Sequence, residues 1–375
     1  MGKNLVVCCD GTANQVVSGD NTNVVRLCAV SIKDPARQIL YYGPGLGTME
    51  AEGALTWWQR AWTKLAGLAS GYAIARDIRN AYSFLMVHYQ PGDRLFLFGF
   101  SRGAYTARAV ASLLRMYGLL RPGNESLVPY IVRELLHVDS LFLRIVDRLS
   151  FGAWKLNQKR VKGKFNKADE VRAIFATRPC KPDFVGVWDT VSSIGLISPT
   201  RIPYTAKNAD IAVGRHALAL DERRVFFNRN LWQQNPRDPA PGPHDVKEVW
   251  FAGVHCDVGG GYPEKDSGLA KLAFDWMVRE ATGHGLLVDQ AVLAKMLADT
   301  PAGNSAPDPN GRMHNSMNGF WPVVEFLPVP RGIHGAFRIN FFRRREVPAG
   351  ALVHASVLKR SGYGRPLPAG HWVEN

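Results

Sequence analysis

A strand-to-helix transition between residues 93 and 118 constrains the fold of this chain most strongly. The apolar run at 95–98 leads directly into G-F-S-R-G at 99–103, and a helical pattern of small and apolar residues follows. A short apolar run bounded by glycines is typical of a buried strand, and the helical spacing is typical of a helix packed on it. G-x-S-x-G in this context predicts a nucleophile elbow, a sharp turn that exposes the hydroxyl of Ser101.

The five-residue match alone also fits an ordinary glycine-rich turn, since the chain contains 36 glycines. The strand before the motif and the helix after it favour the elbow. In an elbow the two glycines keep side chains apart where strand and helix meet. The choice between the two interpretations depends on which other side chains the fold brings to Ser101.

Further apolar runs alternate with helical patterns along the chain. The predicted strands lie at 5–9, 38–42, 95–98, 184–188 and 249–254, and helices are predicted after 22, 55, 103 and 268. A polar, proline-rich excursion at 199–247 carries one predicted helix around H-A-L-A-L-D-E-R-R. Strands and helices that alternate in this way predict an α/β fold with a mostly parallel central sheet and helices on both faces.

A chain of 375 residues can form one large α/β domain with insertions or two modest domains, and we expect a single domain over residues 1–375. The apolar content of 46% is enough for a sizeable core. The stretch 121–180 combines apolar helical patterns with a basic segment, which predicts an inserted helical lid. A solvated helix face is the alternative for the basic segment. Proline and glycine become frequent after Thr300, which predicts a loop-rich C-terminal extension at 300–375.

Four polar side chains directly follow predicted strands: Asp10, Ser101, Asp189 and His255. The carboxyl ends of parallel strands meet at one edge of a sheet, where such folds place their sites. A serine becomes a nucleophile when a base takes its proton, and a histidine base needs a carboxylate to hold its tautomer. The chain order Ser101, Asp189, His255 is the order that α/β-hydrolases use, so these three are the predicted catalytic residues.

Each of these assignments has an alternative. Asp189 could instead cap the segment that follows its strand, and His255 could be a structural histidine with satisfied hydrogen bonds. His354, in A-L-V-H-A-S-V, is the reserve base, because it shares with His255 an apolar lead-in and a turn-like exit. Asp257 is the reserve acid, or else it orients the loop of His255.

Acyl transfer also needs an oxyanion hole, a pair of N–H donors that bind the negative oxygen of the intermediate. One donor is predicted to be the backbone N–H of Arg102, the residue after the serine. The other is predicted in the loop formed by Asp10, Gly11 and Thr12, where the glycine lets the backbone approach a substrate. A phosphatase-type aspartyl nucleophile is the competing role of Asp10, but Cys8 stands where that pattern needs a second acid.

Composition argues against several other kinds of site. The five cysteines have an odd count and no C-x-x-C spacing, which disfavours a disulfide framework and a zinc–thiolate site. The glycine-rich loop at 43–48 lacks the third glycine of a dinucleotide fingerprint. We therefore expect neither a metal nor an organic cofactor. The chain shows neither a long apolar span nor a secretory signal, which predicts synthesis in the cytoplasm.

A series of motifs, spread in order over residues 4–360, resembles one family. They are C-D-G-T at 9–12, T-N-V at 22–24, G-F-S-R-G-A-Y-T-A-R at 99–108, G-V-W-D-T-V at 186–191, A-L-D-E-R-R at 219–224, V-W-F-A-G-V-H-C-D-V-G-G-G-Y at 249–262 and H-A-S-V at 354–357. In these motifs the chain resembles the α/β-hydrolase domain family that contains the type VI secretion phospholipase effectors of the first lipase class. Matched position by position, the resemblance implies an α/β-hydrolase-like fold and a triad of Ser101, Asp189 and His255.

The resemblance further implies a carboxylic ester substrate, which is a phospholipid in the effector branch. It implies export by type VI secretion, with a secretion apparatus and an immunity protein as partners. We hypothesise a serine ester hydrolase of phospholipase A type that acts on lipid-like substrates. In this hypothesis Ser101 attacks the acyl carbonyl, His255 moves the proton and Asp189 holds His255.

The charge of the chain bears on its partners. Lys and Arg outnumber Asp and Glu by 46 to 32, for a formal net charge of +14. Apolar helices rich in Trp and Leu are predicted at 54–70 and 128–150, so this charge favours peripheral contact with an anionic membrane surface. Core packing is the alternative for the tryptophans.

Two rival functions stay open on the sequence alone. One is a metal-dependent phosphoesterase that would use Asp10, Asp189, His255 and Asp257. The other is a binding module without catalytic activity. The pI of about 9.7 would suit a nucleic-acid partner. The sequence shows no nucleic-acid motif, however, and we expect no nucleic-acid partner.

Overall fold

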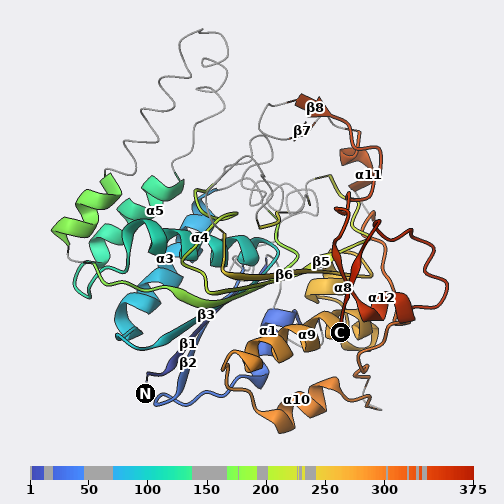
Figure 1. Ribbon diagram of the computed structural model, residues 1–375, viewed down its shortest axis with the longest axis horizontal. Coiled ribbons are helices and arrows are strands. Elements are labelled where there is room, and N and C mark those ends of the chain that lie inside the picture. The colour runs from blue at the N-terminus through green and yellow to red at the C-terminus, as the bar shows by residue number, and fades with distance from the viewer. Residues whose placement is uncertain are drawn as a thin grey trace, which may run out of the picture.

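A parallel eight-stranded sheet forms the centre of the computed structural model (Figure 1). The structure describes residues 2–11, 20–45, 71–136, 167–175, 177–191, 202–225, 227, 230–232, 242–300, 303–318, 321–326, 329–331 and 336–375. The strand order is β10-β9-β6-β5-β4-β3-β1-β2, and every neighbouring pair is parallel. The predicted parallel α/β architecture is confirmed.

The strands of this sheet are β1 (Asn4–Cys9), β2 (Gln38–Gly43), β3 (Arg94–Phe100), β4 (Pro182–Trp188), β5 (Val213–Ala219), β6 (Asp245–Phe251), β9 (Leu352–His354) and β10 (Trp372–Glu374). A separate antiparallel pair consists of β7 (Val329–Arg331) and β8 (Ala336–Arg338). The α-helices are α1 (Asn23–Val30), α3 (Gly71–His88), α4 (Arg102–Tyr117), α5 (Val128–Leu136), α8 (His255–Gly259), α9 (Gly268–Gly283), α10 (Gln290–Leu297), α11 (Trp321–Val324) and α12 (Ala355–Lys359).

Helices cover both faces of the sheet. Helices α3, α4 and α5 pack on the face to which β1 contributes Leu5 and Val7. Helices α1, α9 and α10 pack on the other face, to which β1 contributes Val6 and Cys8. Figure 1 shows the first group above the sheet at the left and the second group below it. Because both faces are buried, the strands need continuous apolar runs rather than alternating ones.

The strand order reverses direction at β1. The chain passes from β1 to β2 on one side and then crosses to β3 on the other side of β1. Ligand sites of open α/β sheets lie outside the carboxyl ends of the strands at such a reversal. Here those ends lead into Asp10, after β1, and Ser101, after β3.

The predicted helix around 216–224 is wrong, because the structure has strand β5 between β4 and β6 at this point. Alanine and leucine favour helices in isolation, but a position in the middle of a sheet overrides that preference. All seven residues of β5 are buried. Arg215 tolerates this burial because its guanidinium forms an ion pair with Glu280 on α9.

The predicted C-terminal extension adds to the central sheet. Strand β9 pairs with β6, and β10 pairs with β9 at the edge. Val353 and Val357 join Trp250 in a third buried apolar cluster. The described residues after Thr300 therefore contribute two strands to the central sheet and part of the core.

Parts of two predicted segments lie outside the described residues: 137–166 of the inserted lid and the helix at 54–70. The described part of the predicted lid segment includes α5, which packs Ile131 and Leu135 into the main core. Trp57, Trp58 and Trp62, for which core packing is the alternative, lie outside the described residues. Among the described helices, none combines the length and the apolar composition that a membrane span requires.

Candidate active site

Ser101 occupies a strained turn between β3 and α4. Its backbone has φ 58° and ψ −119°, angles that residues other than glycine rarely adopt. The flanking glycines permit this turn: a Cβ on Gly99 would lie 2.4 Å from the carbonyl oxygen of Gly103. A Cβ on Gly103 would lie 2.1 Å from the carbonyl oxygen of Cys9. The sharp turn that the G-x-S-x-G motif predicts is therefore present.

Ser101 and Asp189 lie side by side at the carboxyl edge of the sheet. The N–H of Ser101 donates to the carbonyl oxygen of Trp188 at 3.1 Å, and the N–H of Val191 donates to the carbonyl oxygen of Ser101 at 3.3 Å. Asp189 directly follows β4 and is fully buried. Its N–H donates to the carbonyl oxygen of Ala217 in β5 at 2.7 Å. Neighbouring strands thus fix the backbones of both residues.

His255 reaches Asp189 from the first turn of α8, just after β6. Its Nδ1 lies 2.5 Å from Asp189 Oδ2. The imidazole packs on the ring of Phe100, the residue before Ser101, with 4.6 Å between ring centroids. A proton on Nδ1 leaves Nε2 as the nitrogen that can accept another. Burial lowers the pKa of His255 although Asp189 opposes this shift, and this direction favours the neutral ring.

Arg345, in the C-terminal part of the chain, binds the other side of Asp189. Its Nη1 donates to Oδ1 at 2.5 Å and its Nη2 donates to Oδ2 at 3.0 Å, which makes a bidentate ion pair. The N–H of Ala219 also donates to Oδ1, at 3.0 Å. Burial alone would raise the pKa of Asp189, but Arg345 and His255 hold it well below its ordinary value. Asp189 is therefore a carboxylate at neutral pH.

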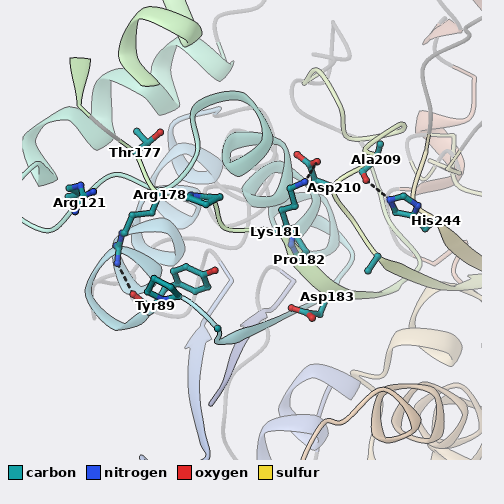
Figure 2. A pocket seen from close by; sticks show the side chains of 14 residues that line it. Tyr89, Arg121, Thr177, Arg178, Lys181, Pro182, Asp183, Ala209, Asp210 and His244 are labelled. Atoms are coloured by element: carbon teal, nitrogen blue, oxygen red, sulfur yellow. Dashed lines mark hydrogen bonds and ion pairs between the residues drawn. The ribbon is translucent and has the colours of Figure 1, made fainter. Parts of the chain in front are cut away.

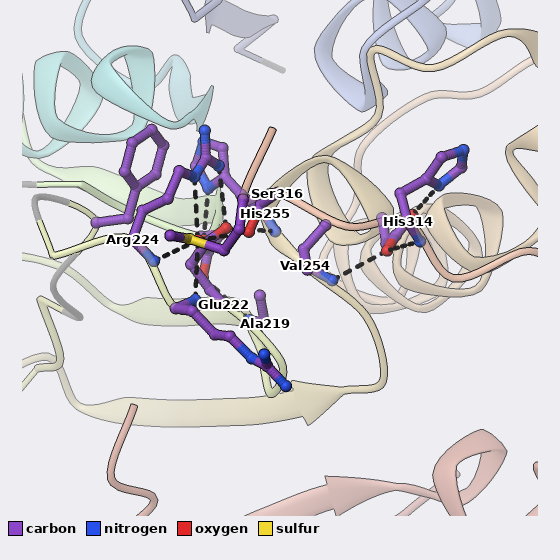
Figure 3. A network of polar contacts seen from close by, with 12 residues as sticks. Ala219, Glu222, Arg224, Val254, His255, His314 and Ser316 are labelled. Carbon is purple, nitrogen blue, oxygen red and sulfur yellow. Dashed lines mark hydrogen bonds and ion pairs between the residues drawn. The ribbon is translucent and has the colours of Figure 1, made fainter. Parts of the chain in front are cut away.

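A second buried carboxylate, Glu222, supports the backbone of His255 (Figure 3). Glu222 Oε2 accepts from the N–H of His255 at 3.1 Å and from Arg224 Nη2 at 2.9 Å. Its Oε1 accepts from the Ser316 hydroxyl at 3.0 Å. Burial would raise the pKa of Glu222, but Arg224 lowers it to about 2. Sequence reasoning placed 219–224 in a family motif without giving Glu222 a role.

Asp257 holds the turn that carries His255. Its Oδ2 accepts from the N–H of Val254 at 3.0 Å, and its Oδ1 lies 2.6 Å from His314 Nδ1. The ring of Tyr262 stacks on His314 with 3.6 Å between centroids. Of the two roles left open by the sequence, these contacts favour orienting the His255 loop. His314, like Arg345, lies in the C-terminal part that sequence reasoning did not connect to the site.

Asp10 lies at the carboxyl end of β1 and has several donors. The Thr22 hydroxyl donates to Oδ2 at 2.8 Å, and the Tyr42 hydroxyl donates to the same oxygen at 2.9 Å. The N–H of Gly11 donates to Oδ1 at 2.7 Å. Arg102 lines the same small cavity as Asp10, between α3 and α4. Thr12, the remaining predicted residue of this loop, lies outside the described residues.

The reserve base, His354, lies elsewhere at the sheet edge. It caps α12, its Nδ1 lies 2.8 Å from the Ser356 hydroxyl, and its ring stacks on Phe251 at 4.5 Å between centroids. Burial lowers the pKa of His354 to about 4. These contacts do not include Ser101 or Asp189, so the structure brings His255 and not His354 to the predicted acid.

The described residues contain no group of three or more His, Cys, Asp and Glu side chains arranged to hold a metal ion. Two of the carboxylates that the phosphoesterase hypothesis would use have separate partners. Asp10 binds Thr22 and Tyr42, and Asp257 binds His314. The five cysteines are free thiols.

A separate cavity opens at the amino edge of the sheet (Figure 2). It lies near the start of β4, and its basic side chains are already engaged. Arg178 donates to the carbonyl oxygens of Tyr89 and Met86, and Lys181 pairs with Asp210 at 3.3 Å. None of the predicted site residues lines this cavity.

Comparison with known proteins identifies a family for this chain. The family profile described as T6SS, phospholipase effector Tle1-like, catalytic domain, matches residues 3–280. The uncharacterized protein YEL023C of Saccharomyces cerevisiae is 28% identical over 246 residues, which are 64% of this chain and 34% of the yeast protein. The chain therefore spans about a third of the length of this relative.

Two solved structures are also similar. The crystal structure of an uncharacterized protein from Pseudomonas aeruginosa has a TM-score of 0.45 and 18% identity, over 81% of this chain and 49% of that chain. The structure of the Tle1 effector bound to the VgrG spike of the type 6 secretion system has a TM-score of 0.33 and 16% identity, over 72% of this chain and 52% of that chain. The chain spans about half the length of each.

Proposed function

This chain belongs to the family of type VI secretion phospholipase effectors with a Tle1-like catalytic domain, and on that premise we propose that it is a serine ester hydrolase. Its substrates are carboxylic esters of lipid-like molecules, and we propose a phospholipase A type of cleavage. The observation that carries this proposal is the 2.5 Å contact between His255 Nδ1 and Asp189 Oδ2 beside the strained turn of Ser101.

In the proposed mechanism, Ser101 Oγ attacks the acyl carbonyl while His255 Nε2 accepts the hydroxyl proton. Asp189 holds the Nδ1–H tautomer and stabilises the imidazolium that forms. His255 then returns the proton to the leaving alcohol, and an acyl-enzyme on Ser101 remains. Water, activated by the same imidazole, hydrolyses this ester and releases the fatty acid.

The oxyanion is proposed to bind two backbone N–H groups, those of Arg102 and Gly11. The first lies at the N-terminus of α4, where the helix dipole favours a negative charge. The second donates to Asp10 Oδ1 at 2.7 Å in the structure. Gly11 can therefore serve as a donor only after the Asp10 carboxylate releases it, which we expect substrate binding to cause.

The cellular role is proposed by extension from the family. The relative whose structure was solved with a VgrG spike is described as an effector of the type 6 secretion system. We propose that this chain is likewise exported by such an apparatus and that an immunity protein protects the producing cell. The net charge of +14 fits a phospholipid substrate at an anionic surface.

The test is hydrolysis of p-nitrophenyl esters of several chain lengths and of phospholipids by the wild type and the Ser101→Ala variant. We expect the wild type to cleave both kinds of ester, in the presence of chelator as well, and the variant to lose this activity. Release of the fatty acid identifies a phospholipase A. Hydrolysis that survives the Ser101 substitution, or that a chelator abolishes, would refute the serine mechanism.

A further inference from the structure

Exposed apolar side chains form a cluster in the C-terminal part of the chain. Phe326 and Phe341 are each 55% exposed, and Ile339 beside them is 40% exposed. The ring of Phe326 lies edge-on to Phe341, at 5.9 Å between centroids, and to Phe342, at 5.5 Å. We call Phe326, Ile339, Phe341 and Phe342 together the aromatic surface. Large apolar side chains that cluster in contact with solvent mark interaction sites on a soluble protein.

The backbone holds this surface in an unfavourable conformation. Phe341 and Phe342 have φ of 49° and 60°, in the left-handed region that bulky residues avoid. A buried carboxylate, Glu325, fixes both of them: its Oε2 accepts from the N–H of Phe342 at 3.3 Å, and its carbonyl oxygen accepts from the N–H of Phe341 at 3.4 Å. Asn340 Nδ2 also donates to Oε2, at 2.6 Å. Such strain persists only where the surroundings enforce it, and here it places an aromatic ring in solvent.

Basic residues border the aromatic surface. Arg343 and Arg344 follow Phe342 directly, and both are exposed. The Arg344 side chain is 39% exposed and lies 3.8 Å from Asp221. Apolar rings with guanidinium groups beside them match the boundary of an anionic bilayer, where rings enter the hydrocarbon and cations meet phosphates.

The same segment leads into the active site. Arg345, the next residue, binds the carboxylate of Asp189 and donates from Nε to the carbonyl oxygen of Phe227 at 2.8 Å. The Phe227 ring packs edge-on against His255. Figure 1 shows α11, β7 and β8, which flank the aromatic surface in sequence, on the opposite side of the molecule from α10. Because Arg345 connects the aromatic surface to Asp189, a membrane on this surface would lie close to the proposed catalytic residues.

We propose that the aromatic surface, with Arg343 and Arg344, is the docking surface through which this protein binds an anionic phospholipid bilayer. The proposal rests on the proposed function, because a lipid hydrolase has to approach its substrate at the membrane surface. It differs from the membrane contact predicted for 54–70 and 128–150, since it uses the C-terminal segment.

The test measures binding of the Ser101→Ala protein to sedimented vesicles, so that hydrolysis does not disturb the equilibrium. The vesicles contain phosphatidylcholine with or without phosphatidylglycerol. The test variant combines Phe326→Ser with Phe341→Asn, because asparagine tolerates a positive φ. The matched control is Trp372→Ser, which removes an aromatic side chain that is 69% exposed on edge strand β10. Circular dichroism checks that each variant is folded.

We expect the parent protein to bind the anionic vesicles more tightly than the neutral ones. The test variant should bind the anionic vesicles roughly tenfold more weakly, since it lacks the two exposed rings that would enter the lipid. The control should bind like the parent. Equal binding of the test variant and the control would overturn the docking surface. A dimer in the parent that the test variant abolishes would also overturn it, because a second copy would then be the occupant.

Failure of the docking surface can be distinguished from failure of the proposed function. If the wild type cleaves dispersed p-nitrophenyl esters but the vesicle data fail, only the docking surface is wrong. If vesicle binding depends on the aromatic surface but no ester is cleaved, only the esterase proposal is wrong. When they are made in the protein that keeps Ser101, Phe326→Ser and Phe341→Asn should lower the rate of hydrolysis on vesicles more than the rate on dispersed esters.

Discussion

Arg345 and Asp189 form a bidentate ion pair across 156 residues of sequence, with 2.5 Å between Nη1 and Oδ1 and 3.0 Å between Nη2 and Oδ2. The family profile ends at residue 280, so the proposed catalytic acid is held by a residue beyond the matched part of the chain. Asp189 therefore has two cationic neighbours to share its charge, Arg345 at all times and His255 when it is protonated. This arrangement makes Arg345 a positioning residue whose role can be measured.

The first prediction concerns Arg345→Met. Without the guanidinium, Asp189 loses two hydrogen bonds and the His255 ring loses its fixed orientation, so kcat/KM should fall roughly 100-fold. The full charge of Asp189 then acts on His255 and raises the pKa of the imidazole. Because the base must be neutral, the acidic limb of the kcat/KM–pH profile should move to higher pH. Arg345→Lys should keep the limb near its wild-type position but recover only part of the rate.

The measurement is the pH profile of p-nitrophenyl ester hydrolysis. Arg312→Met, at a side chain that is 67% exposed, controls for the loss of an arginine as such. A lower rate with an unmoved acidic limb would show that Arg345 stabilises the fold without acting on the Asp189–His255 pair.

The second prediction concerns acid stability. The pKa of Glu222 is lowered to about 2 in the folded protein, against about 4.3 in an unfolded chain. A lowered carboxyl pKa gives stability that is complete above the unfolded pKa and is lost as pH falls through the folded pKa. Glu222→Gln should therefore lower the free energy of unfolding at pH 7 by roughly 3 kcal/mol. The difference from the wild type should shrink between about pH 4.5 and pH 2.

Urea unfolding at several pH values measures this difference, with the exposed Glu346→Gln as the matched control. A deficit that stays constant down to pH 2 would mean that the charge of Glu222 does not cause it.

The third prediction concerns the glycine after Ser101. A Cβ on Gly103 would lie 2.1 Å from a carbonyl oxygen of β1, and neither backbone can move without displacing the sheet. Gly103→Ala should lower the free energy of unfolding by about 3 kcal/mol. Gly283→Ala, where nothing lies within 4 Å of the added Cβ, should be neutral or slightly stabilising. Thermal unfolding compares the two, and equal melting temperatures would contradict the tight turn.

The sequence predicted the parts of the site that local pattern specifies. Asp10, Ser101 and Asp189 each follow a strand directly, and parallel strands bring such residues to one edge. The order of Ser101, Asp189 and His255 then suggested their roles, and the contact between the last two is present.

The features that sequence reasoning missed depend on tertiary contacts. The alanines and Leu218 at the end of strand β5 favour a helix in isolation, and the position of the segment between β4 and β6 makes it a strand instead. Glu222, His314 and Arg345 reach the site through side chains from distant loops. A charged run such as 221–224 resembles a solvated surface until the partner that buries it is known.

The central claim is that Ser101 is a nucleophile activated by His255. The most direct test is the rate at which a fluorophosphonate modifies the protein, followed by intact mass and by mapping of the modified peptide. We predict one adduct, on Ser101, that forms roughly 1,000-fold more slowly in His255→Ala and at the wild-type rate in His354→Ala. An adduct on another residue, or a rate that depends on His354 and not on His255, would contradict the account.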